Sequence, residues 1–182
     1  GFSSGLNTTG IGNTGFGHNA LNSNTSAQAN TAIGNEALST NTVGRRNTAL
    51  GNFALVNSTM GSENVAVGES SLLVYSYNNG TSFDAINTAV GRASLNILNS
   101  TSTSNGIRNT ALGGYAGFNT QISTDCTFLG AYTSVLTPAT AYVNSTAIGY
   151  NAVIDASNKV RIGNNAVTVI EGQVPFTNPS DR

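Results

Sequence analysis

Side chains able to perform acid–base, nucleophilic or metal chemistry are scarce in this chain of 182 residues. Its eight carboxylates are scattered, and none recurs with an acid or base partner at a spacing typical of a glycosidase. Glu36 and Asp84 are the two whose replacement would test glycan hydrolysis. His18 stands where other copies of a repeat carry Asn, Glu, Arg or Tyr, and Cys126 is expected to be a small packed residue. We therefore predict no enzyme, no metal centre and no bound cofactor.

Aromatic side chains are the stronger candidates for a binding role. Exposed aromatic rings on loops are typical contacts for a glycan or a protein partner. The candidates lie in an irregular insertion or recur at one turn position of the repeat, and they are Tyr75, Tyr77, Phe83, Phe53, Tyr115 and Tyr132. The alternative is that these rings cover a thin hydrophobic core, and the sequence leaves both interpretations open.

An internal repeat must position these residues. Its clearest copy is Asn30–Leu38, and near copies begin at Asn47 and Asn87. A glycine follows the small and aliphatic residues of every copy: Gly17, Gly34, Gly51, Gly68, Gly91, Gly113, Gly130, Gly149 and Gly163. The intervals between these glycines run from 14 to 23 residues. One part of each coil is therefore fixed by packing, and the other part is a loop of variable length.

Each copy predicts a short strand that ends at its glycine. The segment Thr31–Ile33 is β-branched and too short for a helix, and alternation places Thr31 and Ile33 on one face and Ala32 on the other. After the turn at the glycine, a second small–aliphatic pair such as Ala37-Leu38 predicts a second short strand.

Two strands and two turns per coil predict an all-β fold. We expect a parallel β-roll or β-solenoid of about nine coils over residues 1–172, followed by an extended exit over residues 173–182. The alternating aromatics around Asn78-Asn79-Gly80 predict a hairpin within residues 73–86, where function should lie if it depends on interruptions of the repeat. Residues 159–172 predict a closing coil and a final strand.

Stacked coils explain why only 8% of the residues are charged, against roughly 25% in an average globular protein. Equivalent side chains of adjacent coils lie about 4.8 Å apart, so a repeated charge would face its own copy. Asparagine and threonine can instead hydrogen-bond along the stack. The expected structural ladder is Asn30, Asn47, Asn64, Asn87 and Asn109, with the turn glycines Gly34, Gly51, Gly68 and Gly91. A threonine ladder through Thr31 and Thr48 is expected beside it.

The core of such a roll is thin. Each coil supplies two or three large apolar side chains, and burying one stabilises by roughly 1.5–3 kcal/mol, whereas ordering the backbone costs roughly 1–2 kcal/mol per residue. The column of small residues that begins with Ala32 and Ala49 would let another chain approach closely. We therefore expect a homo-oligomer.

Charge and hydropathy exclude two classes of partner. The net charge of −1 argues against nucleic acid, which requires a basic surface. No apolar run approaches 18 residues, so we expect no membrane span in this segment.

The repeat resembles a known one. Asn-Thr-Ala-Ile-Gly-x-x-Ala, as it stands at Asn30–Ala37, resembles the head repeats of trimeric autotransporter adhesins, the YadA-like head. The likeness covers roughly residues 13–163, although the coils here are longer than is usual for that family. It implies a left-handed parallel β-roll, an intertwined or side-by-side homotrimer, and an extracellular location.

The C-terminal end carries a second resemblance. Val160–Gly163 followed by Ser180–Arg182 is similar to a junction in phage tail-fibre proteins that precedes the S74 intramolecular chaperone domain. That resemblance implies self-cleavage at Ser180 after the trimer has assembled. It also implies that residues 173–182 lead to a chaperone-like domain absent from this chain.

These observations support one main hypothesis and two alternatives. The main hypothesis is a structural and adhesive segment of a trimeric appendage, a phage or virus tail fibre or a bacterial surface adhesin. It would present loops to a host-surface glycan or protein receptor. The first alternative is an ice-binding or glycan-binding β-solenoid that uses the threonine ladder, and a less favoured one is a fibre-borne polysaccharide hydrolase.

Overall fold

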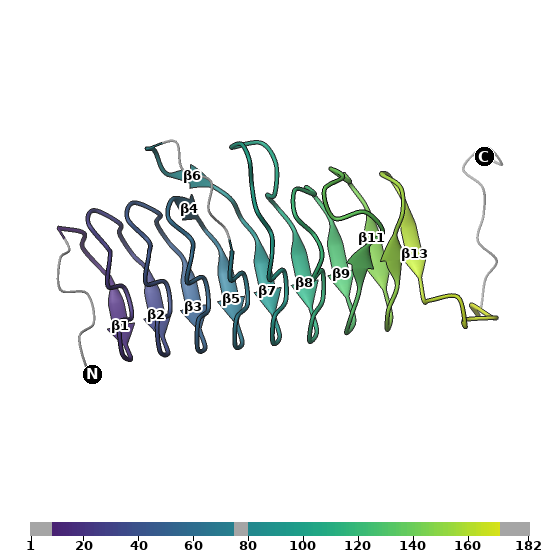
Figure 1. Ribbon diagram of the computed structural model, residues 1–182, viewed down its shortest axis with the longest axis horizontal. Coiled ribbons are helices and arrows are strands. Elements are labelled where there is room, and N and C mark those ends of the chain that lie inside the picture. The colour runs from purple at the N-terminus through teal and green to yellow at the C-terminus, as the bar shows by residue number, and fades with distance from the viewer. Residues whose placement is uncertain (1–8, 75–79, 172–182) are drawn as a thin grey trace.

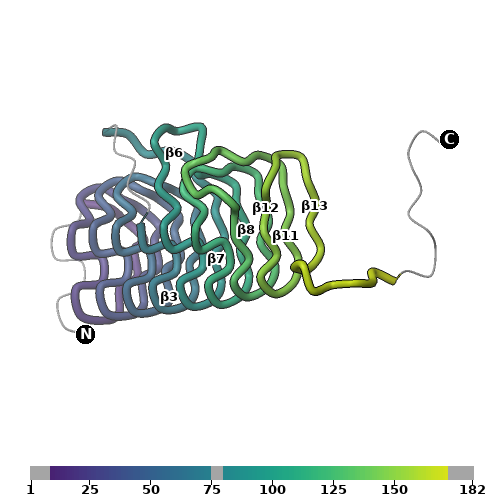
Figure 2. The backbone as a smooth tube through the Cα atoms, turned by 45° about the vertical axis from the view of Figure 1, so that its right-hand side comes forward, coloured from purple at the N-terminus to yellow at the C-terminus, as the bar shows by residue number. Residues whose placement is uncertain are grey.

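The chain folds as a parallel β-solenoid of about eight turns (Figure 1). The computed structural model describes residues 9–74 and 80–171, and within these ranges it contains thirteen short strands and no helix. The nine coils expected from nine glycines correspond to nine stacked strands with about eight complete turns between them. Figure 2 shows the coils stacked around one axis, with the two longest loops rising from the same edge of the stack.

One nine-stranded parallel sheet runs the length of the stack. Its strands, in order, are β1 (Thr14–Phe16), β2 (Thr31–Ile33), β3 (Thr48–Leu50), β5 (Val65–Val67), β7 (Thr88–Val90), β8 (Thr110–Leu112), β9 (Thr127–Leu129), β11 (Thr146–Ile148) and β13 (Val160–Ile162). Every pair is in register, so that Thr31 is opposite Thr48 and Ala32 is opposite Ala49. The predicted parallel stacking of equivalent strands is confirmed.

The alanine column faces inward, which corrects its predicted role. Ala32, Ala49 and Ala66 are fully buried in the core. Leucines such as Leu38 and Leu55, also fully buried, come from the other side of each coil. A flattened coil has room for one large side chain per layer, so small residues are needed on the sheet side. The alanines therefore do not form a surface that another chain could approach.

The predicted second strand is wrong for most coils. After each of the first five coil glycines the chain makes a turn in which a leucine adopts a left-handed backbone, with φ of 57° at Leu21, 51° at Leu38 and 51° at Leu55. This conformation turns the side chain into the core and ends any extended segment. Only the last coils form the second strand, where β10 (Ser134–Val135) pairs with β12 (Val153–Ile154).

In one coil, two residues differ together from their equivalents in the other coils, and the core stays filled. Phe128 takes a position that is alanine in most coils, and Gly117 takes a position that is leucine in the preceding coils. A Cβ atom at Gly117 would lie 2.7 Å from Leu95 Cδ2 and 3.0 Å from Phe128 Cδ2. The phenylalanine ring therefore occupies the space that the missing leucine leaves.

The asparagine ladder is confirmed as a continuous hydrogen-bond chain. Asn47 donates from its backbone nitrogen and from Nδ2 to Asn30 Oδ1, at 2.9 and 3.1 Å, and Nδ2 also donates to the Gly61 carbonyl at 2.9 Å. The same pattern repeats through the stack and ends at Cys126, whose backbone nitrogen donates to Asn109 Oδ1 at 3.0 Å. Asn30, Asn47 and the later members are buried, so the ladder satisfies polar groups that water does not reach.

Replacing Asn64 with alanine is expected to destabilise the solenoid. The backbone nitrogen and Nδ2 of Asn87 both donate to Asn64 Oδ1, at 3.1 and 3.2 Å, and Asn64 Nδ2 donates to Asn47 Oδ1 at 3.1 Å. The substitution leaves the buried Asn87 N–H without an acceptor, a loss of about 1–3 kcal/mol. Urea unfolding would measure this loss. Asn57→Ala, an exposed position of the same coil, is the control, and equal stability of the two variants would contradict the prediction.

The ends and insertions differ in part from expectation. Residues 159–172, predicted as a closing coil and a final strand, contain the last strand of the sheet, β13. The described residues after β13 form no further strand, and Val167, Val169 and Ile170 are exposed. In the insertion, residues 75–79 lie outside the described residues. Its described part includes β6 (Phe83–Asp84), which pairs in parallel with β4 (Gly61–Ser62), so the predicted hairpin stays a prediction. The exit over residues 173–182 also lies outside the described residues.

Candidate ligand-binding ridge

The two residues after each coil glycine form a projecting edge of the solenoid, which we call the turn ridge. They begin with His18-Asn19 and end with Tyr150-Asn151. The second residue of each pair has a left-handed backbone, with φ of 58° at Tyr115 and at Tyr132. Its N–H donates to the preceding coil, as from Tyr115 to the Arg92 carbonyl at 2.8 Å. Successive side chains therefore project from the same edge at the coil spacing.

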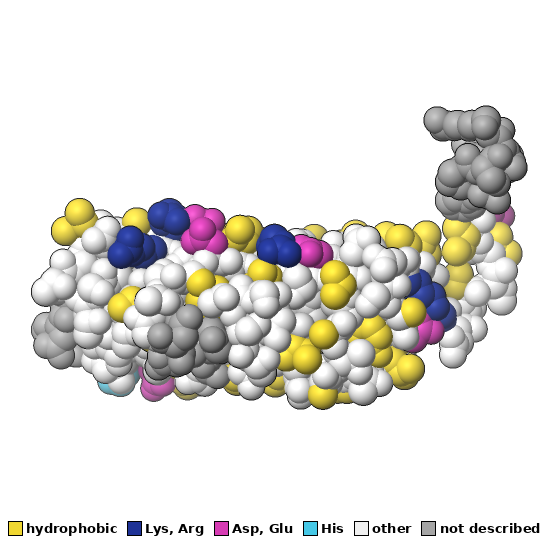
Figure 3. Space-filling model, turned by 90° about the horizontal axis from the view of Figure 1, so that it is seen from above, with side chains coloured by type: hydrophobic (Ala, Val, Ile, Leu, Met, Phe, Trp, Pro, Cys, Tyr) yellow, Lys and Arg dark blue, Asp and Glu magenta, His cyan; other side chains and the backbone are white. Residues whose placement is uncertain are grey.

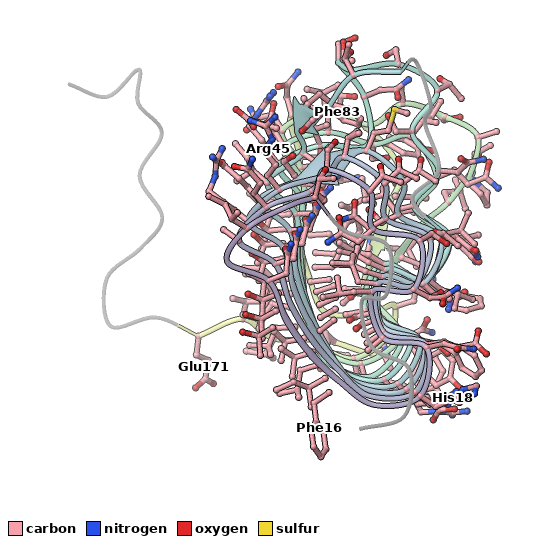
Figure 4. The ribbon with its side chains drawn as sticks, turned by 90° about the vertical axis from the view of Figure 1, so that its left-hand side faces the viewer. Phe16, His18, Arg45, Phe83 and Glu171 are labelled. Carbon is pink, nitrogen blue, oxygen red and sulfur yellow. The ribbon has the colours of Figure 1, made fainter. Side chains whose placement is uncertain are left out.

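The N-terminal half of the turn ridge is polar. His18 Nδ1 lies 3.2 Å from Asn35 Oδ1, and Asn35 Nδ2 donates to Asn52 Oδ1 at 3.0 Å. In Figure 4, His18 points outward at this edge, in a different direction from Phe16 of the sheet. The side chains form a hydrogen-bonded row along the surface, and the described residues contain no group of three or more His, Cys, Asp or Glu that could hold a metal ion.

The C-terminal half is aromatic and begins with an anchored arginine. Arg92 Nε donates to Glu69 Oε2 at 3.1 Å, and its guanidinium carbon lies 5.3 Å from the centroid of the Tyr115 ring. A guanidinium nitrogen also donates to the Tyr115 hydroxyl. The hydrogen bond with Glu69 raises the pKa of Arg92, so this cation is permanent and already paired.

Three tyrosines continue from this arginine along successive coils. The rings of Tyr115 and Tyr132 are stacked, with centroids 5.1 Å apart and planes 5° apart. Tyr150 follows at 5.9 Å from Tyr132 with its plane turned by 77°. Phe118 packs edgewise on Tyr115 at 5.5 Å. Tyr132 is 51% exposed and Tyr150 is 65% exposed, so these aromatic rings are accessible to solvent. Figure 3 shows hydrophobic side chains gathered towards the C-terminal end of the solenoid.

A hollow of about 420 Å³ lies at the C-terminal end of the solenoid, and Asn151, the residue after the last tyrosine, is part of its lining. Asn151, Asp155, Arg161 and Asn165 supply its polar lining, and Leu136 is among its apolar residues. We call this pocket the end hollow. Its volume falls within the range of about 300–1,000 Å³ that is typical of small-ligand sites.

The charged side chains of the end hollow form hydrogen bonds with neighbouring residues. Lys159 donates to Asp155 at 2.7 Å, which holds the pKa of that carboxyl below its ordinary range. Arg161 occupies the core-facing register position opposite Ala147. Its guanidinium donates to the Gly163 carbonyl at 2.9 Å and to Asn165 Oδ1 at 2.6 Å. The arginine therefore closes the end of the core and presents a fixed polar group to the hollow.

The structure brings together only some of the predicted binding residues. Tyr115 and Tyr132 are adjacent, as their shared turn position predicts. Phe53 lies on the same ridge, but Ser70 and Ala93 separate it from Tyr115. Phe83 is partly buried and packs against the core, which agrees with the covering role instead. Tyr75 and Tyr77 lie outside the described residues.

Sequence comparison of the coils missed three contributors. Tyr150 is one residue earlier in its turn than Tyr132, so matching one turn position passes over it. Arg92 contacts Tyr115 of the next coil, and Phe118 packs on Tyr115 within the same coil, and the position of neither residue in the repeat reveals its contact. A search for any aromatic residue within three positions of a coil glycine would have found Tyr150.

Charged residues elsewhere pair along the opposite edge. Arg46 bonds Glu63 through Nε at 2.8 Å and lies 3.7 Å from Asp84. Arg108 forms a two-bond pair with Asp125 at 2.5 and 2.8 Å, which lowers the pKa of that carboxyl. Opposite charges alternate from coil to coil, which avoids the like-charge repulsion expected of a ladder. Figure 3 shows these charges as a row along one edge.

The carboxylates chosen to test hydrolysis lie on different edges. Glu36 is on the turn ridge after β2, with φ of 54°, whereas Asp84 is in β6 at the edge that carries the long loops (Figure 1). The structure therefore does not bring Glu36 and Asp84 together as an acid–base pair.

A second surface is the outer side of the nine-stranded sheet, which we call the sheet face. Its aliphatic and aromatic column is Phe16, Ile33, Leu50, Val67, Val90, Leu112, Leu129, Ile148 and Ile162. Beside it runs the threonine column, which includes Thr31, Thr48 and Thr110 and is interrupted by Val65. Leu50 is 44% exposed and Leu112 is 50% exposed. The sheet face is therefore a long, uncharged and partly apolar surface.

Scans against protein-family models and curated proteins found no match to this chain. Across the described residues there is no helix long and apolar enough to cross a membrane.

Proposed function

We propose that this chain is a non-enzymatic structural and adhesive segment of a homotrimeric extracellular appendage, on a virion or a bacterial surface. The observation that carries the proposal is the sheet face. The uncharged apolar column runs along nine consecutive strands, and six of its nine side chains are exposed. Single apolar residues are normal on the surface of a soluble monomer, but a continuous column of them is not. Such a surface is typical of an interface.

A second copy of the chain is the occupant that fits this face best. Its coils have the same spacing, so ridges and grooves of two sheet faces match along their whole length. The strands contribute threonine and aliphatic side chains there, with no ionised group that association would have to desolvate. Association would also strengthen a core that has about one large side chain on each layer.

The resemblance to YadA-like heads suggests the number of copies and the handedness of the roll. It favours three copies, each a left-handed roll, around a shared axis. The resemblance of the C-terminal end to S74 junctions supports a tail fibre in which self-cleavage follows assembly at Ser180. Three parallel copies present the same surface three times, and avidity then supplies attachment strength to a host-surface glycan or protein receptor.

Sedimentation velocity of the purified chain tests the proposal. The expected result is one species with three times the mass of the chain over a range of micromolar concentrations. A folded species that remains monomeric throughout this range would overturn the proposal.

Ice binding is the second candidate, and one observation favours it. The threonine column faces outward in a flat and regular array, as in Thr31 and Thr48, and not into the core. This surface would be covered in a trimer that uses the sheet face, so the two functions predict different assemblies. Thermal hysteresis by a monomeric chain at micromolar concentration would support ice binding, and its absence would reject it.

A further inference from the structure

We infer that the aromatic half of the turn ridge and the end hollow together form a carbohydrate-binding site for a pyranose oligosaccharide. The inference rests on the proposed adhesive function and names the chemistry of its ligand and the place where it binds. The parts are Tyr115, Tyr132 and Tyr150 on the ridge, with Asn151 and Asp155 in the hollow.

The fold does not require aromatic rings at these positions. At the left-handed position of Tyr115 and Tyr132, other coils carry Asn19, Ser70 or Ala93, with φ between 53° and 56°. At the preceding position, which Tyr150 occupies, other coils carry residues such as His18, Asn35 or Ala131. The turn therefore accepts small residues at both positions, and the core does not use the rings of Tyr132 or Tyr150, which are mostly exposed. Large exposed aromatic area that packing does not need indicates a ligand.

Ring geometry leaves one stacking platform open. Tyr115 is covered by Arg92 on one side and stacked on Tyr132 on the other. The planes of Tyr132 and Tyr150 are 77° apart, so the contact is T-shaped and Tyr132 does not stack in parallel on Tyr150. With 65% of its surface exposed, Tyr150 is the ring of this row that is most open to a ligand. A pyranose has a flat face of C–H groups, whose partial positive charge suits the negative face of an aromatic ring.

The end hollow provides hydrogen-bond donors and acceptors for the hydroxyl groups of a sugar. Asn151 lines the hollow and directly follows Tyr150 in the chain, so consecutive residues connect the tyrosine row to the hollow. The Asp155 carboxylate accepts hydrogen bonds, the amides of Asn151 and Asn164 both donate and accept, and Leu136 gives an apolar wall. This mixture of a few fixed polar groups with apolar walls is typical of small-ligand sites.

Charge pairing favours a sugar over a phosphate-rich polymer. The cations of the region already have partners, since Arg92 bonds Glu69, Lys159 bonds Asp155, and Arg161 bonds the Gly163 carbonyl. Nucleic acid would require unpaired cations. Figure 4 shows the turn ridge, marked by His18, on a different side from Phe16 of the sheet face. Association through the sheet face therefore leaves the site open in every copy.

Saturation-transfer NMR on the full chain tests the inference with four named probes at millimolar concentration. They are methyl α-glucopyranoside, methyl β-galactopyranoside, N-acetylglucosamine and N-acetylneuraminic acid. At least one is expected to receive saturation from tyrosine ring protons. Tyr150→Ala should weaken its binding about tenfold, the upper range of an aromatic stacking contact. Tyr150→Phe should retain binding, because the ring remains.

The matched control is Asn52→Ala on the polar half of the same ridge, which should bind as the original chain does. No transfer to any of the four sugars would overturn the inference. Unchanged sugar binding by the Tyr150→Ala variant would also overturn it. So would a chain that binds a protein receptor and none of the sugars. Circular dichroism shows whether each variant is folded. Sedimentation of the same samples reports assembly separately, so a monomer that binds sugar would reject the trimer and keep the carbohydrate site.

Discussion

Gly51→Ala is expected to prevent the solenoid from folding stably. Gly51 has φ of 142°, a region that residues with a side chain rarely adopt. A Cβ atom there would lie 2.5 Å from the Gly68 carbonyl oxygen and 2.6 Å from its carbonyl carbon. Both contacts are with backbone, so no rotamer change relieves them. Backbone strain costs about 1–3 kcal/mol, and with the overlap we expect a loss above about 4 kcal/mol. Urea unfolding followed by circular dichroism measures it.

Gly114→Ala is the matched control for this prediction. Gly114 lies on the turn ridge, its backbone is not left-handed, and nothing lies within 4 Å of a Cβ atom built there. Other coils carry His18 or Asn35 at the same position. The variant should unfold at the same urea concentration as the original chain. If Gly51→Ala were as stable as the control, the prediction would be wrong. Adjacent coils could then move apart at the glycine column with little loss of free energy.

The stacking of coils could be predicted because it is repeated in the sequence. The coil glycines from Gly17 to Gly130 mark places where successive coils come too close for a side chain, as at Gly34, where an added Cβ would lie 2.3 Å from the Gly51 carbonyl oxygen. Each buried asparagine provides both donors and an acceptor at the coil spacing. These requirements fall on single residues, so residue type reveals them.

The turns after the glycines could not be predicted in the same way. Leucine disfavours a left-handed backbone, so Ala37-Leu38 indicates a strand by residue type. In the stack, the Leu38 N–H donates to the Ala54 carbonyl at 2.9 Å and the side chain is fully buried. Burial and a hydrogen bond from the next coil therefore outweigh a local preference, and neither exists in an isolated segment.

Alternation also left open which face of each strand points inward. It separates Thr31 and Ile33 from Ala32, and by hydropathy alone the face with Ile33 is the better candidate for a core. The small volume inside each coil decides which face points inward. Leu38 and its equivalents already fill the interior, so only the face with Ala32 fits there. The aliphatic face is then left outside, where it becomes the sheet face.

The candidate binding site was predicted in part for a related reason. Tyr115 and Tyr132 share a turn position, and their contact follows from that position alone. The end hollow combines residues from β12, β13 and the chain after β13. Its composition depends on how the last coils change conformation, which no repeat in the sequence describes.

The double substitution Leu50→Asp and Leu112→Asp is expected to convert the proposed trimer into a folded monomer. Both side chains are about half exposed in the single chain, so charges there are hydrated and cost little. β5 and β7 lie between the two strands, so the new charges do not face each other. In the proposed interface each carboxylate would lose water without a partner, a penalty of several kcal/mol per ion. Three copies would bring six such charges together.

Sedimentation velocity measures the mass, and circular dichroism shows that the monomer keeps its β structure. Asn22→Asp with Asn57→Asp adds the same charge at exposed residues outside the nine-stranded sheet, and this control should remain trimeric. A trimeric double aspartate variant would place the contact elsewhere. The sheet face would then be free, and its outward threonine column would become the surface to test for ice binding. A monomer with unchanged sugar binding would instead separate the two surfaces, one for assembly and the other for attachment.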